Sequence, residues 1–349
     1  MLKKSFLVPE WEKQKATILI FPSVESDWNC CFDEVSKKYF EFLEKILRFQ
    51  KVILIVDKNA DSHLIEELNI LDKKTENKLQ IIQNINFNDT WARDSLGLIL
   101  KTDDKKLVLD FNFNAWGGKF DAELDNKITE NLFKKNIYSE LYNQDLNYLK
   151  LENFVEGGAL ETNGELLIAT TKSIINQNRF SENKKSEIEE IFKKYFSINE
   201  ILWLENGDLP NDDTDSHIDL LVRFANKKDI LYTDYRTFDK NIDEEIYHSL
   251  KKMEKELIDF NNSKDNFYNL IPVPTPVYKY QDEFYPASYL NFIFVNNAII
   301  LPIYGTKTDD LAVEIFHKAF PDREIITQDS TTFIRQGGSF HCLTMQLSE

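Results

Sequence analysis

Pairs of short apolar runs are the most regular pattern along the chain. In four places, two runs rich in leucine and β-branched residues flank a short polar turn, an arrangement typical of a β-hairpin. Two of these turns fall at Asn163-Gly164 and Asn296-Asn297. The predicted hairpins span residues 97–109, 158–169, 220–232 and 291–302.

Longer stretches between the hairpins place apolar residues three or four positions apart among charged residues. This spacing is typical of a helix that lies with one face on a sheet. The order of elements is therefore hairpin, helix, strand, repeated, and no proline-, glycine- or serine-rich linker marks a domain boundary. The predicted helices are residues 37–49, 63–71, 126–140, 182–195, 242–260 and 309–320, and further strands are predicted at 16–21 and 52–56.

A polar or reactive side chain recurs at or just before each hairpin. Asp94, Glu156, His217 and Ser288 occupy this place in turn, and Cys342 begins a fifth unit, at intervals of 54 to 71 residues. A period of this length predicts modules stacked around an axis. Because equivalent strand starts would converge on that axis, we expect one mixed α/β domain over residues 1–349 with its site at the centre.

Composition narrows the class of protein. With 349 residues, 42% hydrophobic and 13% aromatic, the chain can bury a large core. A net charge of −17 argues against nucleic acid and anionic membranes as partners, although most of it is expected on solvated helices. No apolar run approaches the roughly 18 residues of a membrane helix and the N-terminus is too short for a signal peptide, so a cytoplasmic protein is expected. Cys30 and Cys31 are interpreted as reduced packing residues, because three cysteines make no disulfide framework.

The segment that ends the chain is apolar and glycine-paired, which predicts an ordered terminus with Cys342 as a nucleophile. Glycine is scarce: six of only ten glycines fall in three pairs, each beside a candidate functional segment. Glycine allows a close approach that a Cβ would block, so these pairs indicate places where backbone meets ligand. The pairs are Gly117-Gly118, Gly157-Gly158 and Gly337-Gly338.

Carboxylates and aromatic residues gather in the segments before the hairpins. Asp94 is interpreted as a hydrogen-bond acceptor for a cation whose apolar stem packs on Trp91; a surface salt bridge of Arg93 is the alternative. Trp116, followed by Gly117, is interpreted as a wall of the pocket. Glu156 fits a structural or a catalytic carboxylate equally well.

His217 and Asp219 would project side by side, because residues two apart on a strand share a face. His341 adjoins Cys342, but strand alternation would turn it away from the site, so a structural role is expected.

Two chemistries suit one cysteine, one histidine and three carboxylates. A metal hydrolase could use His217 with Asp219, Asp94 or Glu156, but no HExxH, HxH or CxxC spacing occurs, and one histidine is few for zinc. The other chemistry is covalent attack by Cys342 on a guanidinium, a planar cation that two carboxylates can hold. The bound cation would lower the pKa of the thiol and so help to form the thiolate.

Six segments together resemble the agmatine deiminases of the guanidine-modifying superfamily, whose pentein fold is a five-bladed α/β propeller of ββαβ modules around a central channel. The resemblance spans most of the chain in the same order. The segments are Trp91-Ala92-Arg93-Asp94, residues 113–118, Glu156-Gly157-Gly158, His217-Ile218-Asp219, residues 287–292 and residues 337–342.

The resemblance implies a deiminase that needs no cofactor or metal and converts agmatine to N-carbamoylputrescine, in putrescine and polyamine biosynthesis. By this likeness Cys342 attacks the guanidinium carbon to form a thiouronium intermediate, Asp94 and Asp219 hold the nitrogens, and Glu156 and His217 move protons. Trp91, Trp116, Gly117 and Gly338 would bind the substrate, and homo-oligomers are common among such enzymes.

Alternatives remain open beside agmatine. Free or peptidyl arginine would be the nearer substrates, and a free α-carboxylate would need a cationic partner. A non-catalytic guanidine-binding protein is a further class. Arginines that could pair with a carboxylate are Arg179, Arg223, Arg236 and Arg335.

Two positions depart from the family pattern. Ser339 and Phe340 replace the usual glycine-rich approach to the cysteine, and Leu96 stands where a glycine usually follows the aspartate. Both departures are expected at the rim of the pocket, where they would affect the choice of substrate.

Overall fold

Five sheets with the same internal order form the framework of the computed structural model, which describes residues 4–180 and 184–349. In each sheet an antiparallel pair of strands is joined by a third strand that runs parallel to its neighbour. The sheets are β5 (Leu98–Thr102), β6 (Lys106–Asn112) and β7 (Asn147–Phe154); β8 (Glu161–Thr162), β9 (Leu166–Thr170) and β10 (Glu200–Leu204); β11 (Val222–Phe224), β12 (Asp229–Asp234) and β13 (Asn269–Pro274); β16 (Ile293–Val295), β17 (Ala298–Ile303) and β18 (Glu324–Asp329); and β19 (Thr344–Ser348), β2 (Gln14–Ile20), β3 (Lys51–Ile55) and β4 (Leu79–Ile82).

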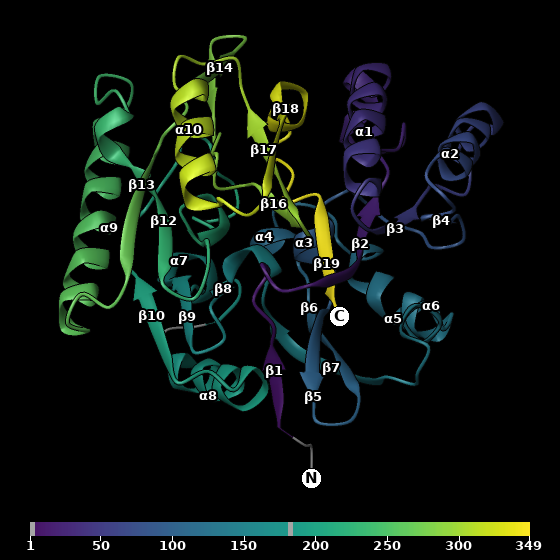
Figure 1. Ribbon diagram of the computed structural model, residues 1–349, viewed down its shortest axis with the longest axis horizontal. Helices are drawn as coiled ribbons and strands as arrows, with labels where there is room; N and C mark the ends of the chain where they lie inside the picture. The colour runs from purple at the N-terminus through teal and green to yellow at the C-terminus, as the bar shows by residue number, and fades with distance from the viewer. Residues whose placement is uncertain (1–3, 181–183) are drawn as a thin grey trace.

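The two ends of the chain meet in the last of these sheets. Strand β19, the final strand, pairs antiparallel with β2 near the N-terminus, and the two lie side by side in Figure 1. A short strand β1 (Ser5–Leu7) is added to the edge of the β5–β6–β7 sheet. A separate two-stranded hairpin is formed by β14 (Tyr278–Tyr280) and β15 (Glu283–Tyr285).

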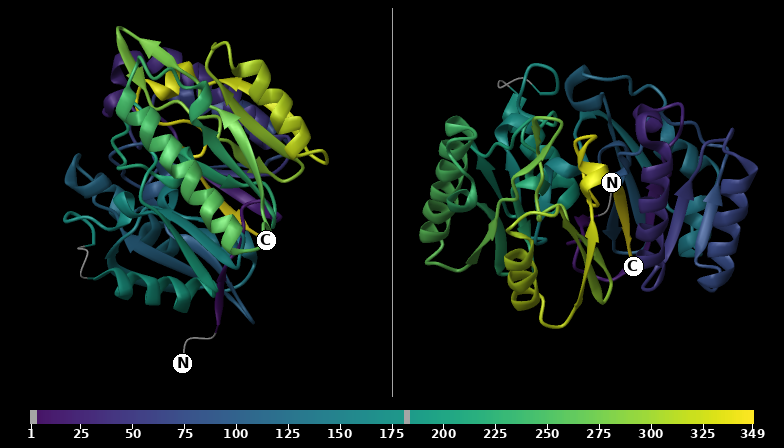
Figure 2. Two further views of the ribbon diagram at one scale, coloured as in Figure 1. Left: turned by 90° about the vertical axis from the view of Figure 1, so that its left-hand side faces the viewer. Right: turned by 90° about the horizontal axis from the view of Figure 1, so that it is seen from above.

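Helices connect the antiparallel pairs to the parallel strands and lie around the periphery of the molecule (Figure 2). Helix α1 shows why: Val35, Tyr39, Phe42 and Ile46 recur at three-to-four spacing and are all buried, which gives it one apolar face. The longer helices are α1 (Phe32–Leu47), α2 (Ser62–Lys74), α5 (Ile128–Lys134), α6 (Ile137–Tyr142), α8 (Lys185–Phe196), α9 (Glu244–Ser263) and α10 (Asp309–Ala319).

The four predicted hairpins all form, and most predicted helices are found within a few residues of their expected bounds. The predicted helix 126–140 is divided, because Asn136 adopts a left-handed backbone (φ 59°) between α5 and α6. The predicted helix 182–195 begins among residues 181–183, which lie outside the described residues; its described part is α8.

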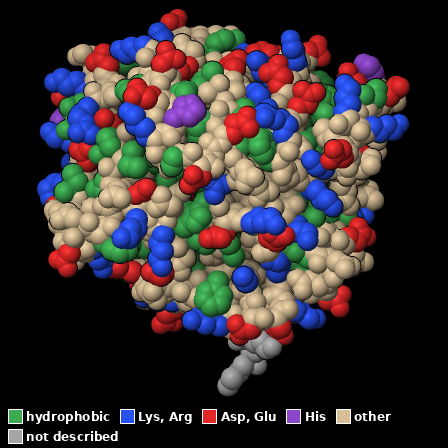
Figure 3. Space-filling view, viewed as in Figure 1, with side chains coloured by type: hydrophobic (Ala, Val, Ile, Leu, Met, Phe, Trp, Pro, Cys, Tyr) green, Lys and Arg blue, Asp and Glu red, His purple; other side chains and the backbone are tan. Residues whose placement is uncertain are grey.

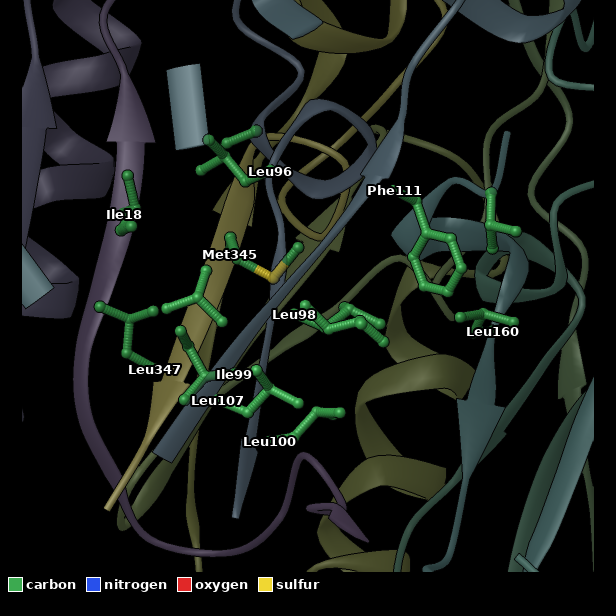
Figure 4. Packing of buried hydrophobic residues seen from close by; sticks show 14 of the residues in the cluster. Ile18, Leu96, Leu98, Ile99, Leu100, Leu107, Phe111, Leu160, Met345 and Leu347 are labelled. Atoms are coloured by element: carbon green, nitrogen blue, oxygen red, sulfur yellow. The ribbon is translucent and has the colours of Figure 1, made fainter. Parts of the chain in front are cut away.

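Packing of the last strand explains the ordered C-terminus. Met345 and Leu347 of β19 are buried in a cluster with Ile18 of β2 and Leu98 of β5 (Figure 4). Full burial of each such side chain stabilises the folded state by about 1.5–3 kcal/mol. The strand therefore fixes the turn just before it, which carries Cys342.

The surface shows acidic and basic side chains interspersed on the face drawn in Figure 3. In the described part of the chain, no helix combines the length and apolar character needed to cross a membrane.

Candidate active site

The reactive side chains lie on turns that precede strands, and all of them are buried. Asp94 is on the short helix α3 (Ala92–Ser95), Glu156 precedes the turn η3 (Gly157–Ala159), and Cys342 precedes β19. His217 caps the turn η5 (Ile218–Leu220), which includes Asp219. The sequence predicted that His217 and Asp219 share a strand face; the backbone is a 3-10 turn there, yet both side chains are enclosed in the same interior.

Gly158 shows how closely these turns approach one another. A Cβ placed on it would lie 2.7 Å from His217 Nδ1, 2.8 Å from Asp94 Oδ1 and 3.1 Å from Asp219 Oδ2. Three site residues from two turns, α3 and η5, thus surround one glycine, whose N–H also donates to Asp94 Oδ1 at 2.9 Å. The glycine is required here because any side chain would occupy the space between the acids and the histidine.

Cys342 faces a carboxylate and an amide. Its Sγ lies 3.8 Å from Asp219 Oδ2 and 3.1 Å from Nδ2 of Asn291. Burial, together with the negative charges of Asp219 and Asp94, raises the pKa of the Cys342 thiol well above its usual value. Without a cation in the pocket, this cysteine is therefore a thiol at neutral pH.

Asp94 is fixed by two donors. Beside the N–H of Gly158, its Oδ2 accepts a hydrogen bond from Trp116 Nε1 at 3.0 Å. Burial raises the pKa of Asp94, as do the charges of Asp219 and Glu156, while His217 opposes the shift.

Glu156 and His217 form a second pair. Arg179 Nε donates to both oxygens of Glu156 at 2.8 and 3.0 Å, and His217 Nε2 is 3.9 Å from Glu156 Oε2. Although burial opposes it, the neighbouring His217 and Arg179 lower the pKa of Glu156. Burial would lower the pKa of His217, but Asp94, Glu156 and Asp219 raise it to about 9, so its ring is charged at neutral pH.

Three buried polar atoms of the site lack a hydrogen-bond partner: both ring nitrogens of His217, and Asp219 Oδ1. Buried polar atoms in folded proteins nearly always find a partner. The unpaired oxygen of Asp219 can accept a hydrogen bond from a bound group, and the ring nitrogens of His217 can donate to one, so the site is suited to a polar ligand.

Aromatic rings and glycines enclose the floor of the pocket, which has a volume of about 630 Å³. Trp91, Trp116 and Gly338 line it together with Asp94 and Cys342. A Cβ at Gly338 would overlap the Trp91 ring and come 3.0 Å from Cys342 Cβ, so this glycine lets the tryptophan approach the thiol.

The predicted wall around Trp116 needs unusual backbone. Trp116 and Gly117 both have positive φ (55° and 92°), and the indole is thereby directed at Asp94. Gly117 itself does not line the pocket; it packs against Asn178 and Arg179 beside it.

Carboxylates dominate the outer part of the pocket. Of the four arginines predicted as partners for a substrate carboxylate, only Arg335 lines it, and Arg335 is already paired with Glu34. Arg179, Arg223 and Arg236 are each engaged by acidic side chains elsewhere. The acids of the outer pocket are Glu25, Asp27, Asp89, Asp121, Asp213 and Glu283; Asp125 also lines the pocket but is buried.

Two expectations about the pocket rim are wrong. Ser339 and Phe340 are fully buried: Ser339 hydrogen-bonds Tyr304 and Ser330, and Phe340 stacks on Phe42 with ring centroids 4.5 Å apart. Leu96 likewise belongs to the hydrophobic core. The departures from the family pattern therefore change core packing, and they do not line the substrate pocket.

His341 and Cys30 also differ from expectation. His341 does not turn away from the site, since it lies on a turn before β19 and its Nδ1 is 2.6 Å from Asp219 Oδ2. Cys30 is exposed instead of packed; its Sγ lies 3.2 Å from that of Cys31.

Asn291 is a site residue that the sequence analysis missed. The periodic pattern marked Ser288, but the Ser288 hydroxyl donates to the backbone oxygen of Leu220, whereas Asn291 donates to both the Cys342 thiol and Asp219. The only signal available was its place inside the family-like segment 287–292.

The metal-hydrolase alternative finds no support in the side-chain geometry. Among residues 4–180 and 184–349, no group of three or more His, Cys, Asp or Glu side chains has an arrangement suited to a metal ion.

Comparisons with known proteins place the chain in a family. The chain matches the family model described as Porphyromonas-type peptidyl-arginine deiminase over residues 6–348. A protein of Mycoplasma capricolum, provisionally named agmatine deiminase, is 29% identical over 99% of this chain and 96% of its own length.

Solved structures agree in fold. A cysteine-to-serine variant of the C. jejuni agmatine deiminase with substrate bound is 34% identical, covers 99% of this chain and 96% of its own, and has a TM-score of 0.87. DDAH from Pseudomonas aeruginosa, 12% identical over 96% of this chain and 100% of its own with a TM-score of 0.52, shares the α/β fold alone. The family resemblance predicted from six short segments is thus confirmed over the full length, and the chain belongs to the Porphyromonas-type peptidyl-arginine deiminase family, as a hydrolase of C–N bonds.

Proposed function

We propose that this protein is an agmatine deiminase that hydrolyses agmatine to N-carbamoylputrescine and ammonia. One observation carries the proposal: the pocket is lined by the buried Asp94, by Trp91 and by exposed acids such as Asp121 and Glu283. Agmatine has the matching chemistry, a guanidinium and an ammonium joined by an apolar stem. Free arginine would bring an α-carboxylate to the acidic mouth, where Arg335 is the lining cation and Glu34 already engages it.

The guanidinium would occupy the space beside Gly158. Asp94 and the unpaired Oδ1 of Asp219 would accept its N–H groups, as carboxylates do in forked pairs with a guanidinium. This grip would hold the guanidinium carbon over Cys342 Sγ. The positive charge of the substrate, added to that of His217, would lower the pKa of the thiol and form the nucleophilic thiolate.

Covalent catalysis would then proceed in two halves. The thiolate adds to the guanidinium carbon, and the tetrahedral adduct expels ammonia, which takes a proton from the charged His217 and leaves a thiouronium (amidino-thioether) on Cys342. A water molecule then gives a proton to the neutral His217 and attacks the same carbon. Collapse of this second adduct breaks the C–S bond and releases the cysteine thiolate, while the hydroxyl proton of the adduct passes to solvent and leaves the neutral ureido product. Glu156 keeps the imidazole oriented through both proton transfers. These residues would suffice without a cofactor.

The proposed function also implies a domain architecture and a cellular role. The five sheets of identical order support a single pentein domain over residues 1–349, with five modules around a central channel. The reaction would supply N-carbamoylputrescine, a precursor of putrescine, for polyamine synthesis in the cytoplasm. Free thiols at Cys30 and Cys31 suit such a reducing compartment.

The decisive test compares substrates and one substitution. Ammonia release is measured with agmatine, arginine and a blocked arginine peptide; we expect agmatine to be preferred by at least about 100-fold in kcat/KM, and equal rates on all three would contradict the assignment. Cys342→Ser should abolish turnover while calorimetry still detects agmatine binding. Cys30→Ser, which removes an exposed thiol, is the matched control and should retain full activity.

A further inference from the structure

Asp219 depends on a second buried histidine behind it. Its Oδ2 accepts hydrogen bonds from His341 Nδ1 at 2.6 Å and from Asn291 Nδ2 at 3.3 Å, whereas its Oδ1 has no partner. The carboxylate is fully buried, and its Oδ2 also lies 3.8 Å from Cys342 Sγ. Oδ2 therefore makes the contacts that hold the carboxylate in place, and Oδ1 is the oxygen left for a bound group to engage.

His341 is in turn held by a carboxylate from the N-terminal segment. Its Nε2 lies 2.9 Å from Glu10 Oε1 and 3.1 Å from Oε2, and Glu10 lies between β1 and β2. Both ring nitrogens therefore face carboxylate oxygens. The two contacts hold the imidazole in one orientation between Glu10 and Asp219.

Two buried arginines fix Glu10. Arg93 Nη1 donates to Oε1 at 2.8 Å, and Arg223 Nη2 donates to Oε2 at 2.6 Å. Although burial opposes the shift, Arg93, His341 and Arg223 keep the pKa of Glu10 well below its usual value. Glu10 is therefore an anion whose two oxygens are both engaged.

The same arginines tie this cluster to the catalytic turns. Arg93 directly precedes Asp94, and its backbone N–H donates to the carbonyl of Cys342 at 3.1 Å. Arg223 also binds Glu161 through Nε at 2.8 Å. Three carboxylates thus alternate with two arginines and a histidine through the interior. The members are Glu10, Glu161, Asp219, Arg93, Arg223 and His341.

We propose that Glu10 and His341 are positioning residues that hold Asp219 ionised, with Oδ1 directed at the substrate guanidinium. The inference rests on the proposed function and deepens it, because it makes a loop near the N-terminus part of guanidinium recognition. A cluster that only supported the fold would leave substrate affinity unchanged once the protein was folded. The relay from Glu10 through His341 predicts a loss of affinity for the cation.

Two substitutions of His341 separate its two contacts. In His341→Asn the side-chain NH₂ can replace Nδ1 and still reach Asp219, whereas in His341→Gln it replaces Nε2 and reaches only Glu10. We expect kcat/KM for agmatine to fall about 10- to 100-fold in His341→Gln, the range for loss of a hydrogen bond to a charged group, and less than about 10-fold in His341→Asn. The loss of kcat/KM in Glu10→Gln should lie between the losses in these two variants.

Binding is measured separately from turnover. In the Cys342→Ser background, the Kd of agmatine should rise by the same order in His341→Gln. Glu161→Gln is the control, because it removes a carboxylate from the same cluster without contact to His341; it should lower the melting temperature but keep kcat/KM within about threefold.

Each outcome has one meaning. The positioning role would be overturned if the agmatine Kd and kcat/KM stayed within threefold of wild type in both Glu10→Gln and His341→Gln. It would also be overturned if His341→Asn and His341→Gln lost kcat/KM equally. Wild-type protein that released no ammonia from agmatine would overturn the proposed function instead. In that case the effect of Glu10→Gln on the binding of guanidinium ion to the Cys342→Ser protein would still test the relay.

Discussion

Two histidines are completely buried within this protein, and their surroundings differ in one respect. His341 has a carboxylate hydrogen-bonded to each ring nitrogen, at 2.6 and 2.9 Å. His217 has carboxylates nearby at 3.7 and 3.9 Å, beyond hydrogen-bond distance, and neither ring nitrogen has a partner.

The difference in hydrogen bonding indicates different roles for the two histidines. A buried polar atom without a partner is costly, so a folded protein keeps one where a ligand will supply the missing bond. We therefore expect the region around His217 to take part in the reaction and the region around His341 to support it. Asp219 combines both features, because its Oδ2 is hydrogen-bonded to His341 and its Oδ1 has no partner.

The largest effect is expected from the unpaired histidine. His217→Asn removes the proton donor and acceptor from the site, and general acid–base catalysis contributes about 10²- to 10⁴-fold. We expect kcat/KM for agmatine to fall at least 10³-fold, measured by ammonia release. His317→Asn, an exposed histidine on α10, is the control and should be neutral. A loss below tenfold would remove His217 from the proton transfers and weaken the contrast with His341.

Much of the first region could be predicted from the sequence, because its residues stand in recognisable segments. Asp94, Glu156, His217 and Cys342 all lie at hairpin starts, and the period between them indicated that they meet. The hairpins themselves were predictable from local apolar runs. A strand after each helix was predicted, but its residues were not. Short, half-buried runs such as β7 and β10 show little alternation of apolar and polar residues.

The second region could not be predicted, for a physical reason. Glu10 meets His341 across 331 positions of sequence, and only the pairing of β19 with β2 brings the two ends together. The outward turn assigned to His341 assumed strand alternation, but the strand begins two residues after Cys342, at Thr344. Ser339 and Phe340 were assigned to the rim by analogy alone, and their burial depends on α1 and on Tyr304.

The second prediction tests whether the reacting groups share one small space. Gly158→Ala would bring a methyl group within 2.7–3.1 Å of His217, Asp94 and Asp219. We expect kcat/KM to fall about 100-fold or more, with agmatine binding to the Cys342→Ser protein lost in parallel, as seen by calorimetry. Gly305→Ala is the control: it has a positive φ of 68° but open space around it, so it should cost about 1 kcal/mol of stability and no activity. Normal activity of Gly158→Ala would show that the guanidinium does not occupy this space.

The third prediction concerns the charge of His217. Its pKa of about 9 in the folded protein exceeds the ordinary value near 6.5, so the protonated ring stabilises the fold fully below about pH 6.5, and this contribution is lost as the pH rises to 9. The shift corresponds to about 3 kcal/mol in the free energy of unfolding. Urea unfolding at pH 6 and pH 9.5 should therefore show a larger loss of stability for Cys342→Ser than for the Cys342→Ser/His217→Asn double variant. Using the serine background removes titration of the thiol, and equal losses in the two proteins would mean that His217 is neutral in the folded state.

The smallest effect is expected at the mouth of the pocket, where no single carboxylate is enclosed as Asp219 is. Asp121 is exposed there, so Asp121→Asn should raise the KM for agmatine by less than about fivefold, the range for one exposed charge, and leave kcat unchanged. The effect should disappear in 0.5 M NaCl, because salt screens an exposed charge but hardly reaches a buried one. Asp145→Asn, an exposed aspartate outside the pocket, is the matched control. A loss of kcat in Asp121→Asn that persists in high salt would mean that Asp121 takes part in catalysis. The reacting part of the pocket would then extend beyond the buried residues to its exposed mouth.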